Sequence, residues 1–184
     1  MNAKLLKWFS VWLMGMVILV VVTQPDERPE KIDIVGFDTT ESAELYFKNM
    51  RSFYYSKSEE GGGIFEVYRY KAIFEDDMPT VHFAIYNNWR TNEAFIRIDT
   101  AAFENGTVEA LRIDSAEMVR RSIILPDFQN ESQYAFARDI YKILERKERL
   151  GILYKDNTEV WLTESQVKSL KQCLKDYFRL VGKL

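Results

Sequence analysis

The residue types most capable of acid–base chemistry gather around His82, the single histidine of the chain. It lies in residues 80–86, TVHFAIY, where the odd-numbered residues are large and apolar, a pattern typical of a strand with one buried face. His82 would then face away from the core, on the side that Arg97 and Asp99 of a later strand could share. A histidine oriented by a carboxylate can act as a general base. His82, Asp99 and Arg97 are therefore the candidate catalytic residues.

The rest of the sequence supplies no partner for such a base. No serine or cysteine stands in a recognisable nucleophile elbow, and the metal-binding patterns CxxC, HExxH and EF-hand are absent. The one cysteine, Cys173, lies beside the apolar stripe of a predicted helix, where a buried thiol is expected. The glycine triplet at 61–63 lacks the Lys-Ser/Thr ending of a phosphate loop. We expect no catalysis, no cofactor and no metal, and the alternative is an exported hydrolase that uses His82 and Asp99.

Aromatic and cationic residues gather on two predicted strands and in the loop that follows one of them. They are Tyr68, Arg69, Tyr86, Trp89 and Arg90. Tyrosine, tryptophan and arginine are enriched at protein interfaces. These five are the candidate binding residues, and the alternative is that half of the rings fill the core between sheet and helices.

Four strands are predicted to position these residues, at 64–74, 80–86, 94–103 and 108–114. They come in one run, with helices mostly after them. This order predicts an α+β fold in which a four-stranded antiparallel meander packs on helices.

The turn between the last two predicted strands fixes a register. Asn105-Gly106 is the strongest short-range signal for a two-residue hairpin. Asp99 would then face Arg112, and Arg97 would face Asp114, with isoleucines on the other face of the sheet. Each such pair contributes up to about 1 kcal/mol. This pairing would give Arg97 and Asp99 a structural role instead of a catalytic one.

Capping residues and apolar spacing predict the helices. The first is expected over 38–56, capped by Asp38, with Phe47, Met50 and Tyr54 on its buried stripe and Tyr46 and Phe53 beside it. The segment at 115–128 is ambiguous and resembles a short helix that ends at Pro126. A long helix is expected from Asn130, with Gln133 as its box partner, to a cap at Gly151. A hairpin at 152–162 and a last helix from Thr163 to Gly182, with Gln166 as its box partner, complete the chain.

The N-terminal segment differs from the rest of the chain. Residues 5–22 are apolar apart from Lys7 and Ser10, and this length, roughly 27 Å of helix, would match the thickness of a bilayer. We predict a single-pass transmembrane anchor, with a cleaved signal as the alternative, and both place the bulk of the chain outside the cytoplasm. The expected organisation is an anchor or signal at 1–24, a tether at 25–36 and an extracytoplasmic α+β domain at 37–184.

Charge and cysteine content narrow the class of partner. The first 25 residues carry Lys4 and Lys7 and no acid, so the net charge of −3 becomes −5 for the remainder. An acidic domain does not suit nucleic acid. A single cysteine excludes an intrachain disulfide, which favours a bacterial envelope over a eukaryotic secreted domain.

Together these features predict a membrane-anchored extracytoplasmic binding or assembly module of the cell envelope, whose partners are the membrane and another protein. A further alternative is an immunity-type protein whose acidic domain caps a toxic partner.

Overall fold

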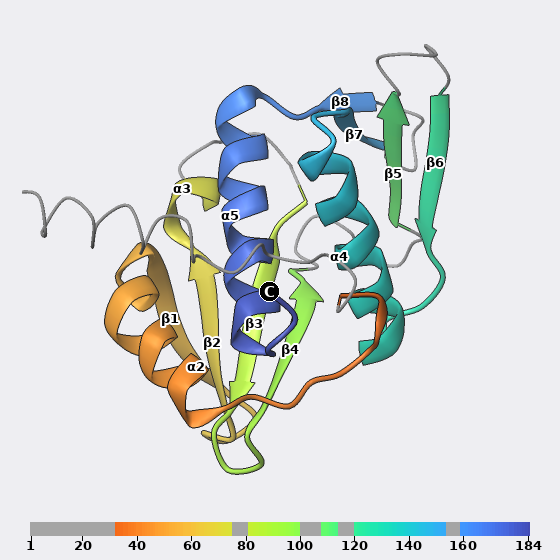
Figure 1. The fold of residues 1–184 in the computed structure, drawn as a ribbon. Coiled ribbons are helices and arrows are strands. Elements are labelled where there is room, and N and C mark those ends of the chain that lie inside the picture. Colours follow the sequence, from red (N-terminus) through yellow and green to blue (C-terminus); the bar gives the residue numbers. More distant parts are fainter. Residues whose placement is uncertain (1–31, 75–80, 100–107, 114–119, 154–158) are drawn as a thin grey trace, which may run out of the picture.

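The chain is an α+β protein with two antiparallel sheets and several helices (Figure 1). The computed structural model describes residues 32–74, 81–99, 108–113, 120–153 and 159–184. One four-stranded sheet has the order β1-β2-β3-β4, and the other has the order β6-β5-β7-β8. The α+β class and a four-stranded antiparallel sheet accompanied by helices are therefore confirmed.

The predicted membrane segment, residues 5–23, lies outside the described residues. Within the described ranges, no helix combines the length and the apolar character needed to span a bilayer. The packed part of the chain includes Ile32, five residues before the domain start expected at residue 37. Ile32 is fully buried, and Tyr134 Oη donates a hydrogen bond of 3.0 Å to its carbonyl oxygen.

The first helical segment changes its winding twice. The α-helix α2 spans Glu41–Tyr46, the π-helical turn η2 spans Phe47–Arg51, and the 3-10 turn η3 spans Ser52–Tyr54. The predicted cap at Asp38 is wrong, because Asp38 is held in an isolated β-bridge with Glu93. Thr40 caps the helix instead, and its hydroxyl accepts a hydrogen bond from the Ala43 amide at 3.2 Å.

The first sheet contains one strand that the sequence pattern did not indicate. Its strands are β1 Tyr55–Glu60, β2 Phe65–Tyr70, β3 Phe83–Asn88 and β4 Glu93–Ile98. β1 has the sequence YSKSEE, which lacks apolar alternation, but it pairs with the whole of β2, from Tyr55↔Tyr70 to Glu60↔Phe65. Gly61, Gly62 and Gly63 all have positive φ and form the turn. The short helix α3, Lys71–Phe74, follows β2.

The predicted pairing of the strands around Asn105-Gly106 is wrong. β5, Val108–Ile113, belongs to the second sheet, where it pairs with β6, Arg120–Leu125, and β7, Arg149–Leu153. Arg112 therefore lies opposite Arg121 and Leu150 instead of Asp99. The turn itself, residues 104–107, and Asp114 lie outside the described residues. β6 also replaces the short helix expected before Pro126, because its sequence RRSIIL pairs along the full length of β5.

The second hairpin is confirmed, and it explains Gly151. β7 pairs antiparallel with β8, Glu159–Trp161. Gly151 was expected to cap a helix, but it lies in β7 opposite Trp161. A Cβ atom at this position would meet the Trp161 ring at 2.8 Å. Glycine is therefore required here by the close approach of the indole.

The two long helices are α4, Asn130–Glu145, and α5, Glu164–Leu180. The capping box of Thr163 and Gln166 is confirmed, as is the end of α5 before Gly182, which has φ 67°. The predicted cap of α4 is displaced by one residue, to Gln129. Its expected box partner Gln133 is buried and instead accepts a hydrogen bond from the Ile98 amide at 2.8 Å.

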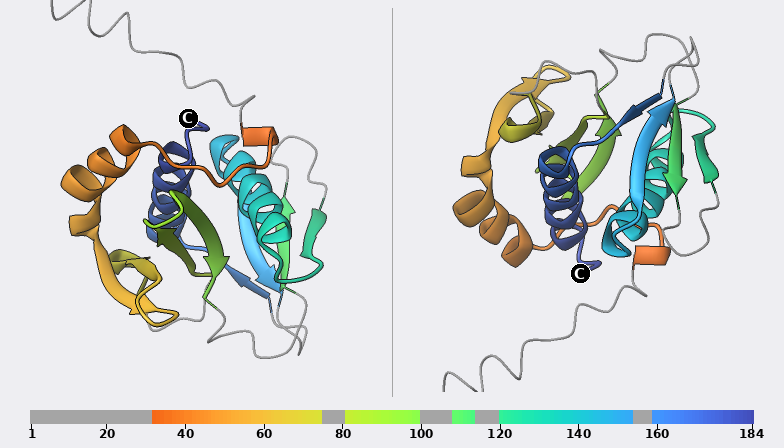
Figure 2. Two further views of the ribbon diagram at one scale, coloured as in Figure 1. Left: turned by 90° about the horizontal axis from the view of Figure 1, so that it is seen from below. Right: turned by 90° about the horizontal axis from the view of Figure 1, so that it is seen from above.

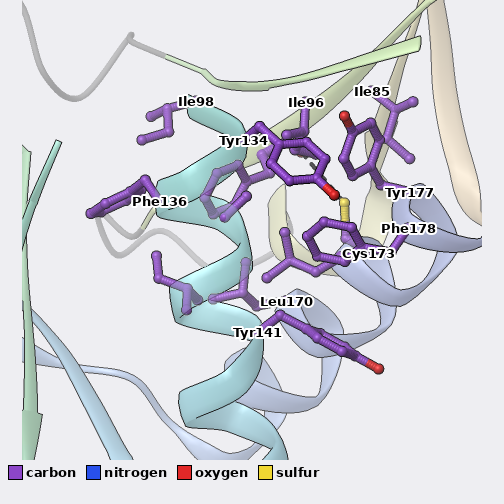
Figure 3. Packing of buried hydrophobic residues seen from close by; sticks show 14 of the residues in the cluster. Ile85, Ile96, Ile98, Tyr134, Phe136, Tyr141, Leu170, Cys173, Tyr177 and Phe178 are labelled. Carbon is purple, nitrogen blue, oxygen red and sulfur yellow. Dashed lines mark hydrogen bonds between the residues drawn. The ribbon is translucent and has the colours of Figure 1, made fainter. Parts of the chain in front are cut away.

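The core lies where α4 and α5 meet the first sheet (Figure 3). Tyr134 of α4 packs against Tyr177 and Phe178 of α5, with ring centroids 6.2 and 5.6 Å apart. Cys173 is fully buried here, as predicted, and its Sγ lies 3.7 Å from the Phe83 carbonyl oxygen. On the other side, α4 contacts β6 and β7 of the second sheet.

Candidate functional site

The first sheet has one face packed on helices and one outer face. Phe47 packs against Tyr55 and Tyr68, and Tyr177 Oη donates to the Ala94 carbonyl, so α5 and the first helical segment cover the same face. Residues that lie opposite each other on neighbouring strands point to the same face of a sheet, so the strand register identifies the residues of the outer face. The outer face carries Ser58, Glu60, Phe65, Arg69, His82, Tyr86, Phe95, Arg97 and Asp99. In Figure 2 the helices α2 and α5 lie on the other side of these strands.

Arg69 is the centre of a polar network on the outer face. Its Nε donates to Asp99 at 2.6 Å, its Nη1 to Ser58 Oγ at 2.8 Å and its Nη2 to Glu60 at 2.8 Å. Tyr86 Oη donates to the other oxygen of Glu60 at 3.1 Å. These bonds to Arg69 and Tyr86 lower the pKa of Glu60. Arg69, a candidate binding residue, is therefore held in place by neighbours within the sheet.

Arg97 is held differently, by aromatic rings. Its guanidinium carbon lies 4.8 Å from the ring centroid of Tyr86, 5.7 Å from that of Phe65 and 6.0 Å from that of Phe95. Nη2 donates to Asn130 Oδ1 at 3.2 Å. Nε is buried and has no hydrogen-bond partner in the part of the chain that the structure describes. A guanidinium has five N–H donors, so the rings fix this side chain while leaving donors available.

A cavity of about 390 Å³ opens beside Arg97. Tyr86, Arg97 and Ile98 line it from the sheet, and Phe128, Gln129, Asn130 and Gln133 line it from the start of α4. The first turn of a helix presents backbone amides without intrahelical partners, which favours negative charge. The cavity therefore combines a fixed guanidinium, amide side chains and an aromatic wall.

His82 and Asp99 lie opposite each other on the outer face. The Asp99 amide donates to the His82 carbonyl at 2.8 Å, while the Asp99 carboxylate accepts from Arg69. Burial lowers the pKa of His82, and the negative charge of Asp99 opposes this shift. One oxygen of the carboxylate that would orient the imidazole therefore already accepts a hydrogen bond from Arg69.

The five candidate binding residues do not form one surface. Tyr68 is buried on the helix-covered face, where its ring packs edge-on against Phe47. Trp89 lies in the turn between β3 and β4 and is 49% exposed, with the Arg90 guanidinium 5.4 Å from its ring centroid. Arg69 and Tyr86 lie on the outer face with Arg97, which the sequence suggested only for catalysis.

A larger cavity of about 880 Å³ lies where the end of α4, β7 and the start of α5 meet. Leu144, Leu150, Leu162 and Val167 form its apolar part. Its charged lining is mixed: Lys147, Arg149, Lys168 and Lys171 stand beside Glu148 and Glu164. Lys171 also pairs with Glu145 at 2.9 Å. This mixture selects no particular ligand.

A second surface feature is an exposed apolar strip near the start of the described chain. Of the eleven exposed large apolar side chains among the described residues, seven lie within residues 34–54 and are together called the apolar strip: Ile34, Val35, Leu45, Tyr46, Met50, Phe53 and Tyr54. Four of them were expected on or beside the buried stripe of the first helix. That expectation is wrong: of the residues on the expected stripe, Phe47 is the one that is fully buried. The π-helical turn at Phe47–Arg51 shifts the residues that follow it around the helix axis.

Comparisons of the chain with protein-family models, with curated proteins and with solved structures found no match. In the described ranges, histidine, cysteine, aspartate and glutamate side chains form no group of three that could hold a metal ion.

Proposed function

We propose that this chain is a membrane-anchored, extracytoplasmic binding module of the cell envelope, which holds another protein without catalysis. Its binding site is the outer face of the first sheet at Arg97. The observation that carries the proposal is the state of that arginine: rings fix its guanidinium, while its buried Nε has no hydrogen-bond partner within the described residues. The same guanidinium lines the cavity beside the start of α4, so a ligand that enters this cavity meets it.

The chemistry of the site favours a carboxylate of the partner protein. A guanidinium binds a carboxylate through two parallel hydrogen bonds. The nearby acid Glu60 is already bonded to Arg69 and Tyr86, which leaves Arg97 for an external acid. Phe128, which is exposed at the rim of the cavity, supplies apolar contact area beside the charge. An acidic side chain flanked by apolar residues is the ligand that matches this surface.

Site-specific photo-cross-linking tests the proposal in cells that express the full chain. A photoreactive amino acid replaces Phe128 at the rim of the cavity. We expect one adduct of defined mass, reduced about tenfold by Arg97→Gln, since a hydrogen bond to a charged group contributes about 1.5–3 kcal/mol. Arg149→Gln is the matched control, because that guanidinium also stacks on a ring, Trp161 at 5.0 Å, but lies on the second sheet.

Two results would contradict the proposed site. One is the absence of any adduct at position 128, and the other is an adduct that Arg97→Gln leaves unchanged. A thermal unfolding curve of each purified variant verifies that the substitution has not unfolded the domain.

A further inference from the structure

The apolar strip and the start of the described chain lie on one side of the molecule. In both views of Figure 2, the turn at Ile32, helix α2 and the C-terminal end of α5 lie along the same side, and the strands β3 and β4 lie behind α5. The strip itself begins at Ile34 and ends at Tyr54. Its apolar side chains therefore follow directly after the segment expected to leave the membrane.

The chain between the predicted anchor and the domain is short. Ile32 is fixed by burial and by the hydrogen bond from Tyr134. Nine steps separate it from Thr23, the end of the apolar run, and even a fully extended chain spans only about 3.5 Å per step, or roughly 30 Å in all. Ile32 would then stay within roughly 30 Å of the bilayer.

We propose that the apolar strip rests on the surface of the bilayer in which residues 5–23 are anchored. This inference rests on the membrane anchorage in the proposed function and adds an orientation to it. Aromatic and aliphatic side chains at the level of the headgroups are favourable there, whereas in water they leave apolar surface exposed.

The rings of the strip are accompanied by cations, as the interface requires. The Arg51 guanidinium lies 4.7 Å from the Tyr54 ring centroid, and that of Arg179 lies 5.5 Å from the Tyr46 ring centroid. Tyrosine is amphipathic and is enriched at the membrane–water boundary, where Arg179 can reach the headgroups. Arg51 is also bonded to buried Asp176, so the strip is held in one position relative to α5.

The orientation has a consequence for the binding site. With the strip on the bilayer, α5 lies between the membrane and strands β3 and β4 (Figure 2). The outer face of the first sheet, with Arg97, then points away from the lipid, where a partner protein can reach it.

Lipid quenching in nanodiscs that contain the purified full chain tests the inference. An environment-sensitive fluorophore is attached to Met50→Cys, or to Ile124→Cys as the matched control. Met50 and Ile124 are exposed by 59% and 54%, but Ile124 lies on β6 of the second sheet. The native thiol, Cys173, is fully buried and does not compete for the label. A lipid quencher placed just below the headgroups should quench position 50 at least threefold more than position 124.

Each other outcome overturns the inference in a distinguishable way. Equal quenching at both positions in nanodiscs that contain the chain would show that the chain is anchored but that the strip does not lie on the bilayer. A blue shift at position 50 without lipid quenching assigns the strip to contact with a second copy. If the chain does not enter nanodiscs at all, the membrane anchorage in the proposed function is contradicted as well. In the double variant Leu45→Ser/Phe53→Ser, which changes two exposed side chains, quenching at position 50 should fall at least twofold.

Discussion

At the scale of single residues, Asp176 ties the first helical segment to the last helix. It is buried on α5, and it accepts hydrogen bonds from Arg51, Tyr55 and Gln172, all at 2.9–3.0 Å. Removing this carboxylate leaves the partly exposed Arg51 and the buried Tyr55 hydroxyl without their acceptor, which costs about 1–3 kcal/mol. We expect Asp176→Ala to lower the free energy of unfolding by this amount in urea denaturation.

The matched control for Asp176 is Asp139, whose pair with Arg138 at 2.9 Å is more exposed. Exposed pairs contribute less than about 1 kcal/mol. Asp139→Ala should therefore leave the unfolding midpoint nearly unchanged. Equal effects of the two substitutions would show that Asp176 does not hold the segment in place.

His82 makes the free energy of unfolding of the domain depend on pH. Burial lowers its pKa from the ordinary value of 6.5, so the unfolded chain binds a proton more readily than the folded one. The stabilisation by neutral His82 is complete above about pH 6.5 and is lost as the pH falls toward the pKa of the folded state. We expect the free energy of unfolding to fall more steeply between pH 7.5 and 5.5 in the wild type than in His82→Gln. Parallel curves would mean that His82 titrates alike in both states.

Sequence reasoning at this scale worked best where a rule is local. The outward orientation of His82, Arg97 and Asp99 follows from strand alternation, and it is confirmed. The partner of Asp99 was missed, because Arg69 reaches it from a strand whose register depends on the whole sheet. The ring contacts of Arg97 and the cavity beside it were missed because they are assembled from β2, β3, β4 and α4.

At the scale of elements, Gly151 shows how a strand depends on its neighbour. A Cβ atom there would meet the Trp161 ring at 2.8 Å, and forcing an extra carbon into a packed site costs about 1–3 kcal/mol. We expect Gly151→Ala to lower the unfolding midpoint measurably. At Gly36 the nearest contact is the flexible end of Lys183, so Gly36→Ala should change the midpoint much less. Equal tolerance at both positions would contradict the packing of β7 against β8.

The capping box of α5 is the element-level feature that the sequence predicts most directly. Thr163 Oγ1 accepts from the Gln166 amide at 3.3 Å, and Gln166 Oε1 accepts from the Thr163 amide at 2.9 Å. Thr163→Ala should lower the free energy of unfolding by about 1 kcal/mol, and Thr163→Ser should largely preserve it. Denaturation curves of both variants check this, and a loss with Thr163→Ser as large as with Thr163→Ala would contradict it.

Elements were mistaken where local signals competed with pairing across the fold. Residues 120–125 resemble the end of a short helix, but β5 offers them a partner along their full length. The strand at Tyr55–Glu60 has charged residues where a core strand would alternate, because it lies at an edge of the first sheet. The two-sheet arrangement cannot be read from a single hairpin signal.

At the scale of the whole molecule, the domain has two different sides. One side carries the apolar strip, and the other carries the outer face of the first sheet with Arg97. The sequence predicts the apolar run at 5–23 but not the exposure of Met50, Phe53 and Tyr54, which accompanies the change of helical winding at Phe47–Arg51. The placement of the domain outside the cytoplasm stays a prediction from the charges that flank the run.

The most direct test of this placement is thiol labelling of Trp89→Cys in the full chain. Trp89 is 49% exposed in the turn between β3 and β4, and Cys173 is fully buried and should not react in the native protein. A membrane-impermeant maleimide is added to cells with a permeabilised outer membrane, and the labelled fraction is compared before and after lysis. We expect the labelled fraction at position 89 to be the same before and after lysis. Labelling at position 89 that appears only after lysis would contradict this placement.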